Sequence, residues 1–75
     1  MNIAEFKNEA RQEMTLAVQI IEASPEVCKD RYDRYMMVIQ KLSEGSRAKA
    51  IFIADFMIEC GANKNGVHAA LQLSI

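Results

Sequence analysis

The sequence predicts an all-α protein, a compact bundle of three longer helices and a short C-terminal helix. Apolar residues recur at helical spacing in four successive segments, and Gly, Pro or Ser residues stand between the segments. No segment alternates apolar and polar residues for long enough to indicate a strand. The predicted helices cover approximately residues 3–23, 25–43, 46–60 and 64–73.

Length and composition are those of one folded domain, residues 1–75. Hydrophobic residues make up 51% of the chain and charged residues 25%, which is typical of a globular protein. A chain of this length buries only about 60% of the surface of its unfolded form, so a partner subunit would add stability. The net charge of −1 provides neither a basic field that attracts nucleic acid nor an acidic tail that mimics it.

The first predicted helix, residues 3–23, starts after Asn2, a capping residue that precedes Glu5 by three positions. Its last turns, residues 16–21, are apolar on nearly every side, which predicts that more than one neighbouring element covers this end. The apolar residues that recur along the whole helix are Ile3, Phe6, Ala10, Met14, Ala17 and Ile21.

In the second predicted helix, Ser24 is placed as the N-cap and Pro25 as the first helical residue. The balanced charges from Lys29 to Arg34 fall four positions apart and predict a solvated outer face. The residues expected to line its inner face are Cys28, Tyr32, Tyr35, Ile39 and Leu42.

The junction before the third helix combines Gly45, suited to a left-handed C-cap, with Ser46, suited to an N-cap. Between positions 50 and 60 the only polar residues are Asp55 and Glu59, which lie four apart on one narrow stripe. This helix is therefore expected either to be the most buried one in the chain or to be completed by a second subunit.

A turn at Gly61 links the third helix to the short fourth one, with apolar residues at Cys60, Ala62, Val67 and Ala70. Residues 56–72 thereby resemble the helix-turn-helix segment of bacterial DNA-binding proteins, in which a sharp turn lets two helices cross on one core. The resemblance implies that the last helix presents its outer face to the major groove of DNA. The contact positions it implies are Asn63, Lys64, Asn65, His68 and Gln72.

Two residues depart from the helix-turn-helix pattern. Met57 stands where a small residue usually lets the helices approach, and Gly66 stands where a polar residue usually supports the recognition helix. An ordinary helical hairpin that only packs against the core would show the same Gly turn and apolar spacing. The sequence leaves both interpretations open.

The middle of the second helix is the predicted protein interface, formed by Tyr32, Tyr35, Met36 and Met37. Neighbouring residues on a helix cannot both face one core, so at least one of Met36 and Met37 is expected to point sideways or outward. Methionine is common on adaptable binding surfaces, although it also fills gaps in cores.

The sequence predicts no enzyme, metal site, cofactor or small-molecule substrate. His68 and Cys60 lack an orienting group and an oxyanion donor, and two distant cysteines with one histidine do not have the clustered spacing of a zinc site. Cys28 and Cys60 are expected to be reduced, buried thiols in a cytoplasmic protein, because small secreted scaffolds carry more closely spaced cysteines. No apolar run reaches the length of a membrane span.

Two functions remain. The first is a non-enzymatic regulatory or inhibitory protein that binds a larger protein target or itself as a homodimer. Its size and composition are frequent among accessory proteins of mobile genetic elements. The second is a small DNA-binding transcriptional regulator that uses residues 56–72 as a C-terminal helix-turn-helix.

Overall fold

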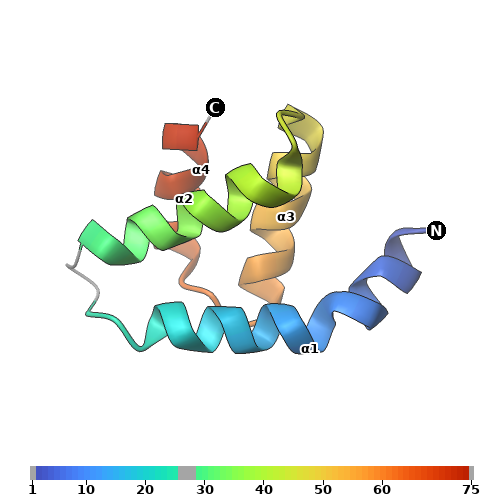
Figure 1. The fold of residues 1–75 in the computed structure, drawn as a ribbon, viewed down its shortest axis with the longest axis horizontal. Helices are drawn as coiled ribbons and strands as arrows, with labels where there is room; N and C mark the ends of the chain where they lie inside the picture. The colour runs from blue at the N-terminus through green and yellow to red at the C-terminus, as the bar shows by residue number, and fades with distance from the viewer. Residues whose placement is uncertain (1, 26–28, 75) are drawn as a thin grey trace.

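A computed structural model describes residues 2–25 and 29–74, and within them the chain forms four α-helices and no strand (Figure 1). The all-α prediction is confirmed. The helices are α1 (Ile3–Glu22), α2 (Lys29–Ser43), α3 (Arg47–Glu59) and α4 (Lys64–Ser74). α1 and α2 run in opposite directions along the long axis of the molecule, whereas α3 and α4 cross behind them.

Two helices begin directly after the capping residues predicted from the sequence. The Asn2 side chain accepts a hydrogen bond from the Glu5 N–H at 2.8 Å, and the Ser46 hydroxyl accepts one from the Lys49 N–H at 3.2 Å. Gly45 has a φ of 82°, as expected for a left-handed C-cap. Pro25 is not helical, and the predicted start of α2 falls partly on residues 26–28, outside the described residues, as does Cys28.

The turn between α3 and α4 is closed by backbone hydrogen bonds at Gly61, whose φ of 106° is a left-handed conformation that favours glycine. The N–H groups of Gly61 and Ala62 donate to the carbonyl oxygens of Ile58 and Met57, each at 3.0 Å. These two bonds form a Schellman motif, which satisfies carbonyl groups that the end of α3 would otherwise leave free. The predicted helix stop is therefore present at the predicted residue.

The best-covered part of the core lies where α2 packs on α3 and α4. Tyr35 and Ile39 on α2, together with Phe56 on α3, have no exposed surface. A Cβ atom built on Gly66 of α4 would lie 3.0 Å from the Tyr35 ring, so the ring occupies the space that a side chain would need. This contact is the physical reason for a glycine inside α4, where the helix-turn-helix pattern has a polar residue.

A buried ion pair joins the end of α1 to the start of α2. Glu22 pairs with Arg31, and its carboxylate also accepts a hydrogen bond from the Asn63 N–H at 2.8 Å. Only 6% of the Arg31 side chain is exposed. The expectation that the whole charged run from Lys29 to Arg34 is solvated is therefore wrong at Arg31, although Asp30 and Arg34 do pair on the surface at 3.0 Å.

The N-terminal half of α1 is attached to α3 through aromatic rings and one ion pair. Phe6 lies 5.7 Å from Phe52 and 6.0 Å from Phe56, measured between ring centroids. Lys7 pairs with Glu59 at 2.9 Å. These contacts hold only one flank of α1.

The opposite flank of α1 is open, contrary to the sequence-based expectation. Leu16 and Ile20 are 54% and 63% exposed, so the prediction that several neighbours cover residues 16–21 is wrong for these two side chains. The apolar arc of α1 is wide, and folding fully buries only the part that carries Met14, Val18 and Ile21, with Phe6 and Ala10 partly buried against the core. α3 has the most buried positions of the four helices within the described residues, which agrees with the first of the two expectations for it.

Candidate protein-binding groove

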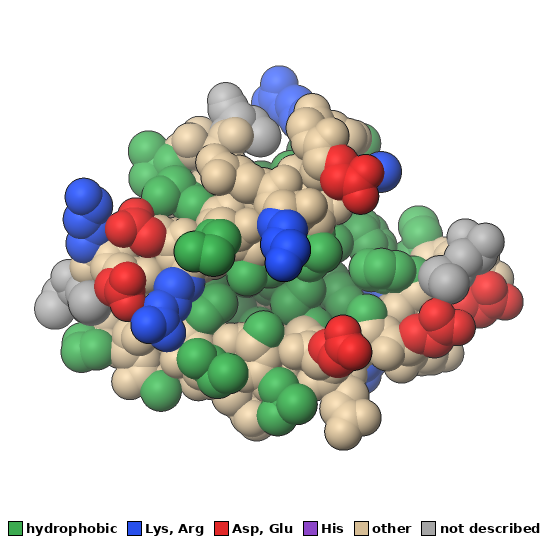
Figure 2. All heavy atoms as spheres, in the orientation of Figure 1, with side chains coloured by type: hydrophobic (Ala, Val, Ile, Leu, Met, Phe, Trp, Pro, Cys, Tyr) green, Lys and Arg blue, Asp and Glu red, His purple; other side chains and the backbone are tan. Residues whose placement is uncertain are grey.

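An apolar groove separates α1 from α2 on one face of the molecule. It consists of two adjoining cavities of about 360 and 430 Å³, which share Phe6 on α1 and Leu42 on α2. We call the two together the α1–α2 groove. Figure 2 shows hydrophobic side chains gathered in this hollow, with basic side chains bordering it over α2 and an acidic one over α1.

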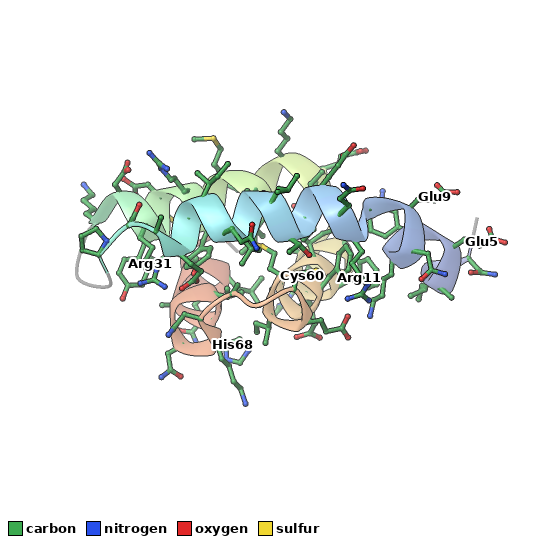
Figure 3. All side chains as sticks on the ribbon, turned by 90° about the horizontal axis from the view of Figure 1, so that it is seen from below. Glu5, Glu9, Arg11, Arg31, Cys60 and His68 are labelled. Atoms are coloured by element: carbon green, nitrogen blue, oxygen red, sulfur yellow. The ribbon has the colours of Figure 1, made fainter. Side chains whose placement is uncertain are left out.

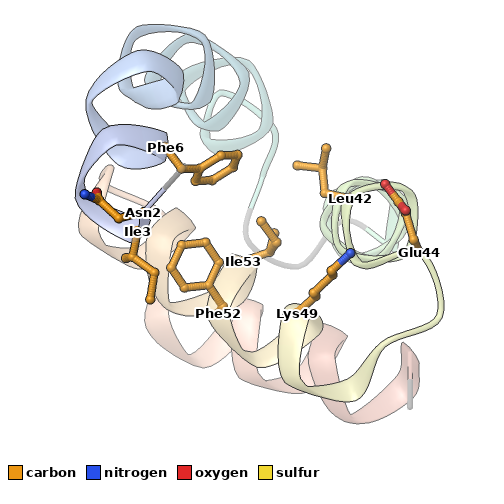
Figure 4. Close-up of a pocket in the computed structure, with 8 residues that line it drawn as sticks. All are labelled: Asn2, Ile3, Phe6, Leu42, Glu44, Lys49, Phe52 and Ile53. Atoms are coloured by element: carbon orange, nitrogen blue, oxygen red, sulfur yellow. The ribbon is translucent and has the colours of Figure 1, made fainter.

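The first cavity lies where the N-terminal end of α1, the C-terminal end of α2 and the first turns of α3 meet (Figure 4). Phe52 and Ile53 of α3 face it from one side, while Phe6 and Leu42 approach it from two different helices. Lys49 and Glu44 stand at its border on the side of α2 and α3. The cavity is therefore apolar inside and charged at one edge.

The second cavity continues along α1 as far as Ala17. Its walls are Phe6, Ala10, Glu13, Met14 and Ala17 from α1, and Val38, Lys41 and Leu42 from α2. The small side chains of Ala10 and Ala17 leave the backbone of α1 accessible to close approach. Small residues of this kind allow a second helix to pack closely.

The wall of the groove formed by α2 and α3 carries both charge signs, Glu44 among them, whereas the charged side chain on the α1 wall is acidic. Lys41 of α2 and Lys49 of α3 are exposed on one wall, and Glu13 of α1 is exposed on the other. Glu5 and Glu9 lie at steps of four residues before Glu13, so the same flank of α1 is acidic over a little more than two turns. Both acidic side chains project from α1 into solvent (Figure 3).

Exposed apolar side chains are most numerous on the two helices that border the groove. Among the described residues, five of the seven large hydrophobic side chains that are exposed lie on α1 or α2. These five are Ile3, Leu16, Ile20, Met37 and Leu42. Single exposed hydrophobic residues are ordinary, but a contiguous patch with a polar rim marks a binding surface.

The residues predicted to form an interface on α2 fall into three environments. Met37 is 63% exposed, whereas Tyr32 and Met36 are half-buried. Tyr35 has no exposed surface, which corrects its assignment as an interface residue, because a side chain enclosed by the core cannot contact a partner. Leu42, expected on the inner face, is instead 41% exposed and lines both cavities.

The residues predicted to contact DNA are mostly on the surface of α4. Lys64, Asn65, His68 and Gln72 are exposed, and their spacing places them on one side of the helix. Asn63 is half-buried, and its side chain accepts a hydrogen bond from the Gly66 N–H at 2.8 Å. Asn63 thus caps α4, a role that the resemblance did not assign to it.

Comparisons with protein-family models, with curated proteins and with solved structures found no match for this chain. Among residues 2–25 and 29–74, no three His, Cys, Asp or Glu side chains cluster closely enough to hold a metal ion. Within the same residues, no helix combines the length and the apolar character needed to cross a bilayer.

The groove was not predicted from the sequence, although part of the pattern that forms it is visible there. Along α1, a row spaced alternately by three and four residues consists of Ile3, Phe6, Ala10, Glu13, Ala17 and Ile20. Residues at this spacing form the seam along which one helix packs against another. It runs beside the buried row of Met14, Val18 and Ile21, and the two together make the apolar arc wider than one core contact requires.

Proposed function

We propose that this chain is a non-enzymatic regulatory or inhibitory protein that acts by binding another protein chain through the α1–α2 groove. The observation that carries the proposal is an apolar groove between the two helices that hold five of the seven exposed large hydrophobic side chains of the described residues. Removing such a surface from water is the dominant favourable term in protein association.

The dimensions of the groove fit a helical segment. Its walls extend along α1 from Asn2 to Ala17, a length of about 22 Å at the helical rise of 1.5 Å per residue. Four turns of a partner helix span the same distance. A helix that places its apolar face in such a groove makes contacts at every third or fourth residue.

A protein that binds in this way acts by occupying a surface of its partner. The walls of the groove offer apolar side chains and a few charged groups at the rim, an arrangement suited to holding a protein surface. A small domain bound to a larger protein changes the activity of that protein by covering its surface or by holding one of its conformations. A regulatory or inhibitory role follows from that mode of action.

The test is affinity capture from the native host with tagged, nuclease-treated preparations of three chains: wild type, Leu42→Glu and Ile51→Glu. Leu42 and Ile51 are 41% and 43% exposed, but only Leu42 lines the groove, so the second substitution is a matched control. We expect a stoichiometric protein to be retained by the wild type and by Ile51→Glu and to be lost with Leu42→Glu. Equal retention by all three chains would rule out the groove as the binding site.

A second candidate function is DNA binding through α3 and α4. The observation that favours it is the exposed row of Lys64, Asn65, His68 and Gln72 on α4, next to the turn at Gly61. Asn and Gln pair with adenine edges, and Lys reaches guanine or phosphate.

This alternative has its own test, which does not involve the groove. DNA binding predicts a complex that is lost on nuclease treatment, weakened by added salt and abolished by Lys64→Glu. Leu42→Glu should leave that complex unchanged. If Lys64→Glu has no effect on any activity of the chain, the DNA-binding hypothesis fails.

A further inference from the structure

We propose that Asn65 is a site of spontaneous covalent modification, at which the side-chain amide becomes a carboxylate at a rate set by the Asn63 cap of α4. Asn65 is the one asparagine of the chain that a glycine follows. It lies exposed in the first turn of α4. The inference does not depend on the proposed function, because neither asparagine lines the α1–α2 groove.

The reaction needs only the chain and water. The backbone nitrogen of Gly66 attacks Cγ of Asn65 and bonds to it, while the bond from Cγ to the side-chain nitrogen breaks. That nitrogen leaves as ammonia with the proton that Gly66 loses. Water then opens the resulting succinimide ring at either carbonyl group, which yields aspartate or isoaspartate. A glycine favours the attack because no side chain shields its nitrogen and its backbone rotates most freely.

The packing of α4 on α2 keeps a glycine in the attacking position. A Cβ atom built on Gly66 lies 3.0 Å from the ring of Tyr35, a side chain with no exposed surface. Any larger residue at position 66 would therefore press on the enclosed core. The nitrogen that follows Asn65 consequently stays unshielded by a side chain.

In the folded chain the Asn63 cap restrains the reaction. The Gly66 N–H, on the nitrogen that must attack, donates to Oδ1 of Asn63 at 2.8 Å. The Val67 N–H donates to the carbonyl oxygen of Asn63 at 2.9 Å and closes the same turn. Ring formation also requires the ψ angle of Asn65 to leave the helical region. The reaction therefore proceeds from conformations in which this turn has opened locally.

The cap is anchored on the end of α1. The backbone N–H of Asn63 donates to the Glu22 carboxylate at 2.8 Å, and Glu22 pairs with the buried Arg31. A change at Glu22 thus reaches the first turn of α4 through Asn63. The rate at Asn65 should depend on this residue of a different helix, which a susceptible asparagine without such contacts would not show.

Conversion changes the surface of α4. A carboxylate at position 65 adds a negative charge next to Lys64, on the side of the helix that also carries His68. The added charge makes this side less attractive to a polyanion. Isoaspartate also adds a carbon atom to the main chain directly before Gly66, so the first turn can no longer pack on Tyr35 in the same way.

The test is the rate of carboxylate formation at position 65, measured by peptide mass spectrometry after incubation of the full chain at physiological pH and temperature. We expect Asn63→Ala to react about fivefold faster than the wild type, because loss of a cap raises the open population by about that factor. Asn63→Ser keeps a capping oxygen and should react at close to the wild-type rate. Glu22→Ala removes the anchor of the cap and should accelerate the reaction. Asn8, which is exposed on α1, is the internal control and should stay unconverted.

A variant at a distant core position separates local opening from global unfolding. Ile53→Ala removes a buried side chain that faces the groove, so it lowers the global stability without touching the cap. Its rate at Asn65 should equal that of the wild type. Equal rates in the wild type and Asn63→Ala, or an equal rise in Ile53→Ala and Asn63→Ala, would overturn the role of the cap. Conversion of Asn65 no faster than that of Asn8 in Asn63→Ala would overturn the site itself.

Discussion

The two sides of α2 differ in how completely folding covers them. On one side Tyr35 and Ile39 are enclosed by α3 and α4, whereas on the other Val38, next to Ile39 in sequence, lines an open groove. Removing apolar surface from water favours folding and association alike. The enclosed side therefore stabilises the monomer, and the open side is the surface that we propose binds a partner.

The largest expected difference in stability is between truncations of two neighbouring residues on α2. Ile39→Ala removes a fully buried side chain and should lower the free energy of unfolding by about 3 kcal/mol. Val38→Ala should lower it by less than about 1 kcal/mol in dilute solution, because water already reaches the side of the groove. Urea unfolding followed by circular dichroism measures both. Similar losses for the two variants would show that the groove is part of the folding core.

The ion pair at the end of α1 provides a second, smaller contrast. Glu22→Gln leaves the buried Arg31 without its anionic partner. The Glu22 side chain itself is 25% exposed in the wild-type chain. The expected loss of stability is about 2 kcal/mol. The matched control is Glu13→Gln on the groove side of α1, for which we expect a change within about 0.5 kcal/mol. Equal effects would mean that the pair contributes no more than a surface charge.

The close contact between α2 and α4 predicts a third effect. Gly66→Ala gains about 1 kcal/mol of helix propensity but forces a methyl group against the Tyr35 ring. Overpacking costs about 1–3 kcal/mol, so the net result should be a destabilisation of about 1 kcal/mol in thermal or urea unfolding. Stabilisation by Ala would show that the ring moves aside easily and that the enclosed side is less tightly packed than the structure indicates.

The smallest expected effect concerns the Tyr35 hydroxyl, which is buried and makes no hydrogen bond with the described protein atoms. Tyr35→Phe removes a polar group from an apolar site and should raise the free energy of unfolding by about 0.5–1 kcal/mol. A clear loss of stability in the same unfolding assay would mean that the hydroxyl has a hydrogen-bonding partner in solution.

The sequence predicted the parts of the fold that local chemistry determines. Asn2 and Ser46 cap helices because their side chains reach N–H groups three residues away, and Gly61 ends α3 because its backbone is left-handed. Such interactions need only a few neighbouring residues. Helix bounds could therefore be predicted to within a few residues.

Features that depend on how helices meet were not predictable from one sequence. Arg31 is buried because Glu22 reaches it from another helix, although its neighbours in sequence indicated a solvated face. Tyr35 is buried because Gly66, 31 positions later, leaves room for its ring. The groove likewise exists because α1 and α2 are held apart over α3, and no local pattern encodes that separation.

Methyl chemical shifts in the nuclear magnetic resonance spectrum test most directly whether the open side of α2 is the binding surface. They are recorded for the free chain and for the complex it forms with its partner or with itself. We predict that the signals of Leu16, Val38 and Leu42 shift on association, whereas those of Ile51 and Leu73, which line neither cavity of the groove, stay in place. Shifts confined to Ile51 and Leu73, with the groove signals unchanged, would contradict the account.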